Sequence, residues 1–159
     1  MHQANIAEEH WLTKHDTWPE VNNIGVIIGC GMSKLLSKTG KRKLGAERLY
    51  RILITESAHL IWKMRCERIL ERNDREQWHT AREIQNRWVC AINKRLSLDQ
   101  AMTSRKYETK AISTQIVQCT WSGTLKNELS LPENWINYSG VLVGIRSPEQ
   151  SWQQQAEPP

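Results

Sequence analysis

The chain has 159 residues, of which 39% are hydrophobic and 25% are charged, and its formal net charge is +5. This length suits one domain with a core of its own and is short for two. Apolar runs stay well below the roughly 18 residues of a membrane-spanning helix, so we expect no membrane partner. The first residues lack the basic and then apolar order of a secretory signal, which predicts an intracellular protein without separating nucleus from cytoplasm.

The positive charge is concentrated in the middle of the chain. From Lys34 to Lys110 there are 19 Lys and Arg residues against 9 Asp and Glu, a balance of +10, whereas the remainder has 3 against 8, a balance of −5. Such asymmetry favours a polyanionic partner such as a nucleic acid, without implying sequence specificity. Solvated helix faces are charged as well, so charge alone leaves both interpretations open.

The first predicted elements are short. A helix over about residues 4–15 would end before Pro19, because the residue that precedes a proline disfavours the helical conformation. The run GVIIG at residues 25–29 has the composition of a strand, as has SGVLVGI at residues 139–145. Two such pieces do not make a stable sheet on their own.

The strongest predicted element is an amphipathic helix over about residues 46–71. One side carries Leu49, Leu53, Leu60 and Met64, a wider stripe adds Tyr50, Ile54 and Ile61, and the opposite side carries Arg48, Arg51, Thr55 and His59. This 3.6-residue period is typical of a helix with one buried face.

A second long helix is predicted to begin at Thr80, because Thr80 and Glu83 have the spacing of a capping box. One face carries Ile84, Trp88, Ala91 and Ile92, and the other carries Asn86, Asn93, Lys94 and Ser97. The polar stretch ERNDREQWH between the two helices predicts a turn, and hence an antiparallel hairpin. Its interior should include Leu53, Leu60, Met64, Ile84 and Trp88.

A third helix is predicted over about residues 110–127, although Gly123 weakens it. The last residues are rich in Pro and Gln, which is typical of a disordered end. We therefore expect a mainly α fold: a single small helical domain over residues 1–146 that contains the long-helix hairpin, and an irregular, disordered tail over residues 147–159.

Residues 26–45 combine an apolar run, paired glycines and a cluster of cations, which raises the possibility of a phosphate-binding loop. A dinucleotide fingerprint needs glycines at its first, third and sixth positions, but Gly29 and Gly31 are followed by Lys34. A P-loop needs a glycine five residues before its Gly-Lys pair, where this chain has Leu35. Both templates fail, so a turn that leads into the long helix is the better interpretation.

Other catalytic patterns fail too. Polymerase and ribonuclease H chemistry require clustered carboxylates for two metal ions, whereas Asp16, Asp74 and Asp99 are isolated in sequence. His59 and Cys66 would lie about 10 Å apart on one helix, too far to share a zinc ion. The spacing of the cysteines predicts free thiols, at Cys30, Cys66, Cys90 and Cys119. We expect no enzyme, no cofactor and no metal site.

Four segments of the sequence are distinctive: AEEHWLTKHDTWPEV, GAERLYRILITESAHLIWKMRCERIL, EIQNRWVCAINKRLSLD and TWSGTLKNELSLPENWINYSGVLVGI. They resemble the C-terminal tail of basidiomycete retroelement polyproteins, and the resemblance runs from about Ala7 to Ile145. It implies a region downstream of the reverse transcriptase, near ribonuclease H or zinc-binding regions, present here as a detached fragment. The rest of such a polyprotein is then a possible partner. The resemblance implies no residue role.

Two functions fit these observations. The first is a non-catalytic, nucleic-acid-associated accessory region that binds RNA or single-stranded DNA weakly and without sequence preference, while exposed aromatic residues stack on unpaired bases. The residues predicted to contact phosphates are Lys41, Arg42, Lys43, Arg48, Arg51, Lys63, Arg65, Arg68 and Arg72. The alternative is a helical scaffold or interaction module with no nucleic-acid binding of its own. A continuous cationic face would favour the first, and unsatisfied apolar surface the second.

Overall fold

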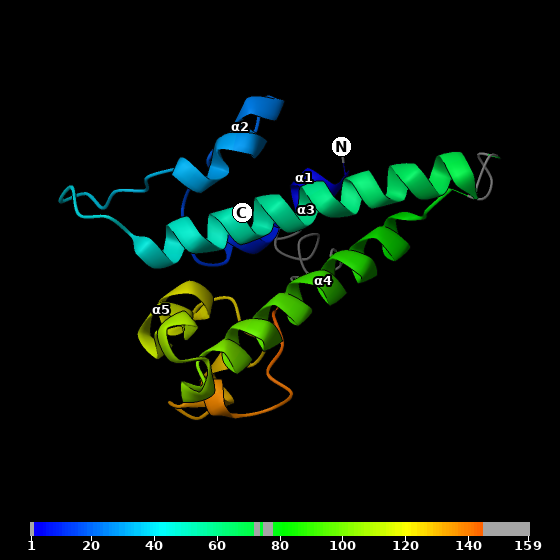
Figure 1. The fold of residues 1–159 in the computed structure, drawn as a ribbon. Coiled ribbons are helices and arrows are strands. Elements are labelled where there is room, and N and C mark those ends of the chain that lie inside the picture. Colours follow the sequence, from blue (N-terminus) through cyan, green and yellow to red (C-terminus); the bar gives the residue numbers. More distant parts are fainter. Residues whose placement is uncertain (1, 72–73, 75–77, 145–159) are drawn as a thin grey trace, which may run out of the picture.

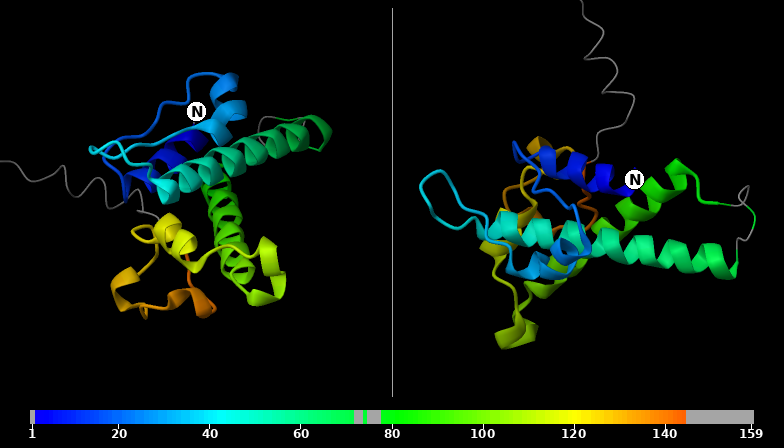
Figure 2. Two further views of the ribbon diagram at one scale, coloured as in Figure 1. Left: turned by 60° about the vertical axis from the view of Figure 1, so that its left-hand side comes forward. Right: turned by 90° about the horizontal axis from the view of Figure 1, so that it is seen from above.

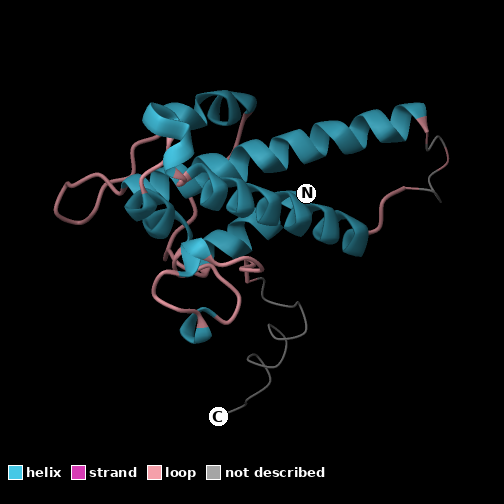
Figure 3. Cartoon of the chain, turned by 60° about the horizontal axis from the view of Figure 1, so that its bottom comes forward, coloured by secondary structure: helices cyan, strands magenta, loops and turns pink. Residues whose placement is uncertain are grey.

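The structure is a computed structural model, and it describes residues 2–71, 74 and 78–144 (Figure 1). The α-helices are α1 (His2–Leu12), α2 (Ile24–Gly29), α3 (Leu44–Leu70), α4 (Ala81–Met102) and α5 (Thr114–Trp121), and the 3-10 helices are η1 (Cys30–Met32), η3 (Arg105–Lys110), η4 (Glu128–Ser130) and η5 (Trp135–Asn137). Over these described residues Figure 3 shows only helices and loops, with isolated bridges from Leu36 to Arg42 and from Leu125 to Val143. The predicted mainly α fold is confirmed.

The two longest helices begin close to the predicted places. Thr80 precedes α4, and its hydroxyl accepts a hydrogen bond from the backbone N–H of Glu83 at 3.2 Å. This bond satisfies one of the free N–H groups at the helix start. In Figure 1, α3 and α4 diverge from the connection between them, of which residues 72–73 and 75–77 lie outside the described part. The two helices of the predicted antiparallel hairpin are therefore inclined to each other rather than aligned along their lengths.

Helix α5 packs against the first turns of α3. Gly45 in α3 lies so close to the backbone of Cys119 in α5 that a Cβ atom at position 45 would overlap the Cys119 carbonyl. Lys14, in the segment after α1, donates from Nζ to the carbonyls of Cys119 and Thr120 at 2.6 and 3.2 Å. A cation at the end of a helix satisfies carbonyls that have no partner within it.

The core lies where α1, α3, α4 and α5 meet. Leu53, Leu60, Met64 and Trp88 are buried as predicted, and Ile84 is half-buried against the same core. The indole Nε1 of Trp88 donates to the hydroxyl of Ser57 at 2.9 Å. The predicted stripe on α3 is too wide, because Ile61 is exposed.

The tryptophans divide into an inner and an outer group. The buried ones are Trp11, Trp88, Trp121 and Trp135, the half-buried one is Trp18, and the exposed ones are Trp62 and Trp78. Trp11, Trp18 and Tyr50 contact one another edge-on, with ring centroids 5.5 to 5.9 Å apart. Most of the tryptophan side chains that the structure describes therefore fill the core.

The strand predicted at residues 25–29 is wrong, since Ile24–Gly29 is the helix α2. The side chain of Asn23 caps it by accepting from the backbone N–H of Val26 at 3.1 Å. A run of β-branched residues shows strand composition, but no neighbouring strand is present among the described residues to pair with it.

Two further expectations need correction. The predicted helix over 110–127 is shorter, because α5 ends at Trp121 and Gly123 takes a positive φ of 87° that leaves the helical path. Among the described residues of the stretch predicted as a second strand, only Val143 forms a bridge. This bridge residue is tied to α4, because its N–H donates to Oδ1 of the half-buried Asn93 at 2.8 Å. The disordered tail predicted over residues 147–159 lies outside the described residues.

Candidate nucleic-acid interface

The cations at positions 34–43 lie on one loop, which we call the basic loop. Backbone hydrogen bonds close it like a hairpin, from Lys43 N–H to Leu35 O at 2.8 Å and from Ser37 N–H to Lys41 O at 2.7 Å. Gly40 turns the chain with a φ of 76°. Both views of Figure 2 show the loop extending away from the helices. The backbone bonds give the loop a defined shape, and its position gives its side chains access to solvent.

Within the part of the chain that the structure describes, the lysines of the basic loop have no acidic partner. Lys34, Lys38, Lys41 and Lys43 are exposed and form no ion pair with the described residues. The sequence has no Asp or Glu between Glu20 and Glu47. The loop is therefore a local concentration of unneutralised positive charge.

Arg42 differs from its lysine neighbours, because it pairs with Glu47 in the first turn of α3. Its Nη2 donates to Oε2 at 2.6 Å and its Nε donates to Oε1 at 3.1 Å. The hydrogen bond from Arg42 holds the pKa of Glu47 below its usual value, and Glu47 also accepts from the Leu35 N–H at 3.0 Å. Arg42 thus fastens the base of the loop to α3.

Arg48, predicted to contact phosphate, is instead engaged inside the molecule. It donates from Nη1 and Nη2 to the two carboxylate oxygens of Asp99 on α4, at 2.5 and 2.6 Å. Asp99 is 1% exposed and also accepts from the indole Nε1 of Trp121 at 2.7 Å. This Asp99 junction joins α3, α4 and α5, and it leaves few guanidinium donors of Arg48 free for a ligand.

The remaining predicted cations are spread along α3. Arg51 donates to the Gly31 carbonyl at 3.2 Å, and the guanidinium of Arg68 lies 4.6 Å from the centroid of the Trp78 ring. Lys63 and Arg65 are exposed. Arg72 lies outside the described residues. A helix rises about 1.5 Å per residue, so Lys41–Lys43 and Arg65 stand more than about 30 Å apart, and the predicted residues do not form one compact patch.

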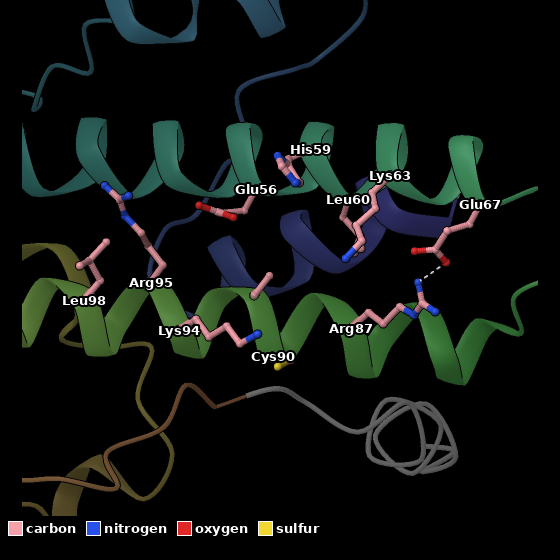
Figure 4. A pocket seen from close by; sticks show the side chains of 11 residues that line it. Glu56, His59, Leu60, Lys63, Glu67, Arg87, Cys90, Lys94, Arg95 and Leu98 are labelled. Atoms are coloured by element: carbon pink, nitrogen blue, oxygen red, sulfur yellow. Dashed lines mark hydrogen bonds and ion pairs between the residues drawn. The ribbon is translucent and has the colours of Figure 1, made fainter. Parts of the chain in front are cut away.

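A second cationic surface, missed in the sequence, lies in the groove between α3 and α4. Figure 4 shows Lys63 of α3 with Arg87, Lys94 and Arg95 of α4 around a hollow of about 480 Å³. Glu56 and Glu67 also line it, and Glu67 is already bonded to Arg87 at 2.6 Å. The Nε atom of Arg95 lies 3.7 Å from Oδ1 of Asp99. The groove therefore has mixed charge. The predicted hairpin brings its two helices together, but which of their cations line the groove depends on how the helices pack.

The electrostatics beside the basic loop also reflect its positive charge. Burial, followed by the nearby charges of Lys14 and Lys43, lowers the pKa of His15 to about 4. His15 is therefore neutral at pH 7 and adds no charge to the surface. Lys14 is held by the end of α5, whereas Lys43 is exposed and forms no ion pair with the described residues.

The described residues contain no cluster of three or more His, Cys, Asp or Glu side chains that could hold a metal ion. The four cysteines are free. In the same part of the chain, no helix combines the length and apolar character required to cross a bilayer.

In comparisons with family models, curated proteins and solved structures, nothing matches this chain. The resemblance to retroelement polyprotein tails stays a prediction. The chemistry of the chain's own residues is what bears on its function.

Proposed function

We propose that the chain is a non-catalytic accessory module that associates with RNA or single-stranded DNA, weakly and without sequence preference. The basic loop supports this proposal: it is exposed, it stands clear of the body, and its four lysines have no acidic partner among the described residues. Lysine is a flexible point charge that suits contacts to phosphate, which carry little sequence information. Such a role fits an accessory region of a fungal retroelement polyprotein, which the sequence resembles.

The structure narrows the set of residues that this proposal uses. Arg42, Arg48 and Arg68 are engaged with Glu47, Asp99 and Trp78. We therefore assign the phosphate contacts mainly to the loop lysines, with Lys63 and Arg65 as outlying contacts. Trp62 directly precedes Lys63 in sequence and is 64% exposed, so it offers an aromatic face to an unpaired base.

A salt titration tests the proposal. Each phosphate contact to a single strand contributes about 0.7 to the slope of log affinity against log salt. Replacing Lys38, Lys41 and Lys43 with Ala should lower the slope for a fluorescent oligonucleotide by about 2. The matched control replaces Arg105, Lys106 and Lys110 with Ala, which removes the same charge elsewhere and should lower the slope by less than about 0.7.

Equal slopes for the two triple variants would show that net charge, rather than the basic loop, drives association. Absence of binding at low salt would refute the proposal outright. Binding that did not depend on salt would refute it too, because phosphate contacts release counterions.

A second function, that of an interaction scaffold, is favoured by apolar surface on α2 and η1. Ile24, Ile28 and Met32 are 69%, 79% and 82% exposed. Clustered exposed apolar side chains are typical of a surface that binds another protein. The two functions are compatible, because the basic loop and this apolar surface use different residues.

A further inference from the structure

An apolar groove lies between α1, α2 and α3. Its volume is about 460 Å³, and its apolar lining includes Trp18, Val21, Ile27, Ile54, Ala58 and Ile61. The hollow is large enough to take a few side chains of a ligand. Ile24 and Ile28 of α2 continue the apolar surface beyond it. An elongated apolar ligand would therefore bury more of this surface than a compact one.

The charge of the apolar groove is opposite to that of the chain. Glu8 of α1 and Glu20 of the following segment line it, and no Lys or Arg belongs to its described lining. Neither carboxylate forms an ion pair with the described residues. Along α3, Arg65 lies one turn beyond Ile61, outside the lining. A protein of net charge +5 thus carries two unpaired acids at its apolar groove.

We infer that the apolar groove binds an amphipathic helical segment of a partner protein, with apolar side chains in the groove and Lys or Arg facing Glu8 and Glu20. A helix whose apolar residues recur every three or four positions can seat them in such a groove. Its basic residues would find the two carboxylates as complementary charges. This inference deepens the scaffold function and does not rest on nucleic-acid binding.

The probe is a pair of fluorescent 18-residue helical peptides, one of Leu and Lys and one of Leu and Glu in the same pattern, titrated with the full chain and followed by anisotropy. The inference predicts that the Leu/Lys peptide binds at least about tenfold more tightly. Net charge alone predicts the reverse order, because a chain of net charge +5 attracts the acidic peptide. The order of the two affinities therefore separates groove recognition from bulk attraction.

Two charge-reversal variants form a matched pair. Glu8→Lys with Glu20→Lys changes both groove carboxylates and should weaken the Leu/Lys peptide about tenfold. Glu9→Lys with Asp16→Lys changes two exposed acids of the same region that do not line the groove, and it should change the affinity less than about twofold. Equal effects from the two variants would overturn the inference.

Filling the groove tests its apolar part. Ala58→Trp adds a large side chain at a half-buried lining position and should abolish peptide binding, with circular dichroism and thermal unfolding confirming that the variant folds. Peptide binding unchanged by Ala58→Trp would overturn the inference that the groove is the binding site, while leaving the scaffold function in place. If neither peptide binds, the groove inference and the scaffold function both fail. Dimerisation of the wild-type chain that Ala58→Trp removes would identify a second copy as the occupant and overturn the inference.

Discussion

The basic loop and the Asp99 junction both contain cations, yet they use positive charge in opposite ways. At the junction, Arg48 is half-buried and directs two donors at one carboxylate. In the loop, four lysines extend into solvent without a partner among the described residues. A rigid fork of donors suits a buried pair, and a flexible ammonium suits a solvated contact. Hence the number of cations in a sequence overstates the number that are free to bind a ligand.

The largest expected effect comes from breaking the junction. Asp99→Ala should lower the free energy of unfolding by about 3 to 5 kcal/mol, because it leaves Arg48 without its counter-charge and Trp121 without its acceptor. Urea denaturation measures this loss. The double variant Arg48→Met with Asp99→Leu should cost less than Asp99→Ala, since no charge then stays unpaired. A loss below about 1 kcal/mol for Asp99→Ala would mean that the junction is not a structural pair.

The same contrast applies to the aromatic residues. Trp88→Ala should cost about 3 to 5 kcal/mol, because Trp88 is fully buried and bonded to Ser57. Trp62→Ala, on the outer face of α3, should change the stability by less than about 0.5 kcal/mol. The denaturation midpoints of the two variants, each measured against the wild type, compare the two losses of stability. Similar losses would show that the inner and outer groups are not distinct.

His10 extends the comparison to a buried group that has no counter-charge. It is 2% exposed, its Nδ1 lies 3.1 Å from the Gly144 carbonyl, and burial lowers its pKa to about 4. Above pH 6.5 His10 is neutral in both the folded and the unfolded chain, so it does not lower the free energy of unfolding there. Between pH 6.5 and 4 only the unfolded chain takes up the proton, so stability should fall by up to about 3 kcal/mol.

Unfolding measured across this pH range tests the role of His10. His10→Gln should make the free energy of unfolding depend less on pH. The smaller dependence that is left is due to the half-exposed His15, whose pKa is also lowered. A His10→Gln profile as steep as that of the wild type would assign the pH dependence to other groups.

The smallest expected effect is on the stability of the loop variant. Replacing Lys38, Lys41 and Lys43 with Ala should change the free energy of unfolding by less than about 0.5 kcal/mol, since these side chains make no contact that folding depends on. Thermal unfolding checks this. A loss above about 1 kcal/mol would give the lysines a structural role and weaken the distinction between loop and junction.

Local patterns predicted the parts of the fold that depend on local sequence. The 3.6-residue stripe located α3 within two residues of Leu44–Leu70, and the Thr80 cap located the start of α4. Composition failed at residues 25–29, where strand-like residues form α2. A strand needs a partner, and whether one is present is not a local property.

The candidate site divides in the same way. The cluster Lys41–Lys43 could be read from the sequence, because neighbours in the chain stay neighbours in a loop. The engagement of Arg48 could not, since Asp99 stands 51 residues further along. The cations of the α3–α4 groove depend on the same long-range packing. The structure therefore brings together fewer of the predicted cations than their number in the sequence suggests, and the nucleic-acid interface stays a prediction.

The close approach of α3 and α5 at Gly45 has a consequence for how mutational tolerance in this chain should be interpreted. Any side chain at position 45 would force the two helices apart. Selection acting only on folding would thus keep this glycine fixed whether or not the chain binds a ligand. Two residues earlier, Lys43 faces solvent, and only selection for binding would constrain it. A saturation library over positions 43–45, scored separately for abundance and for nucleic-acid retention, would separate the two pressures within three codons.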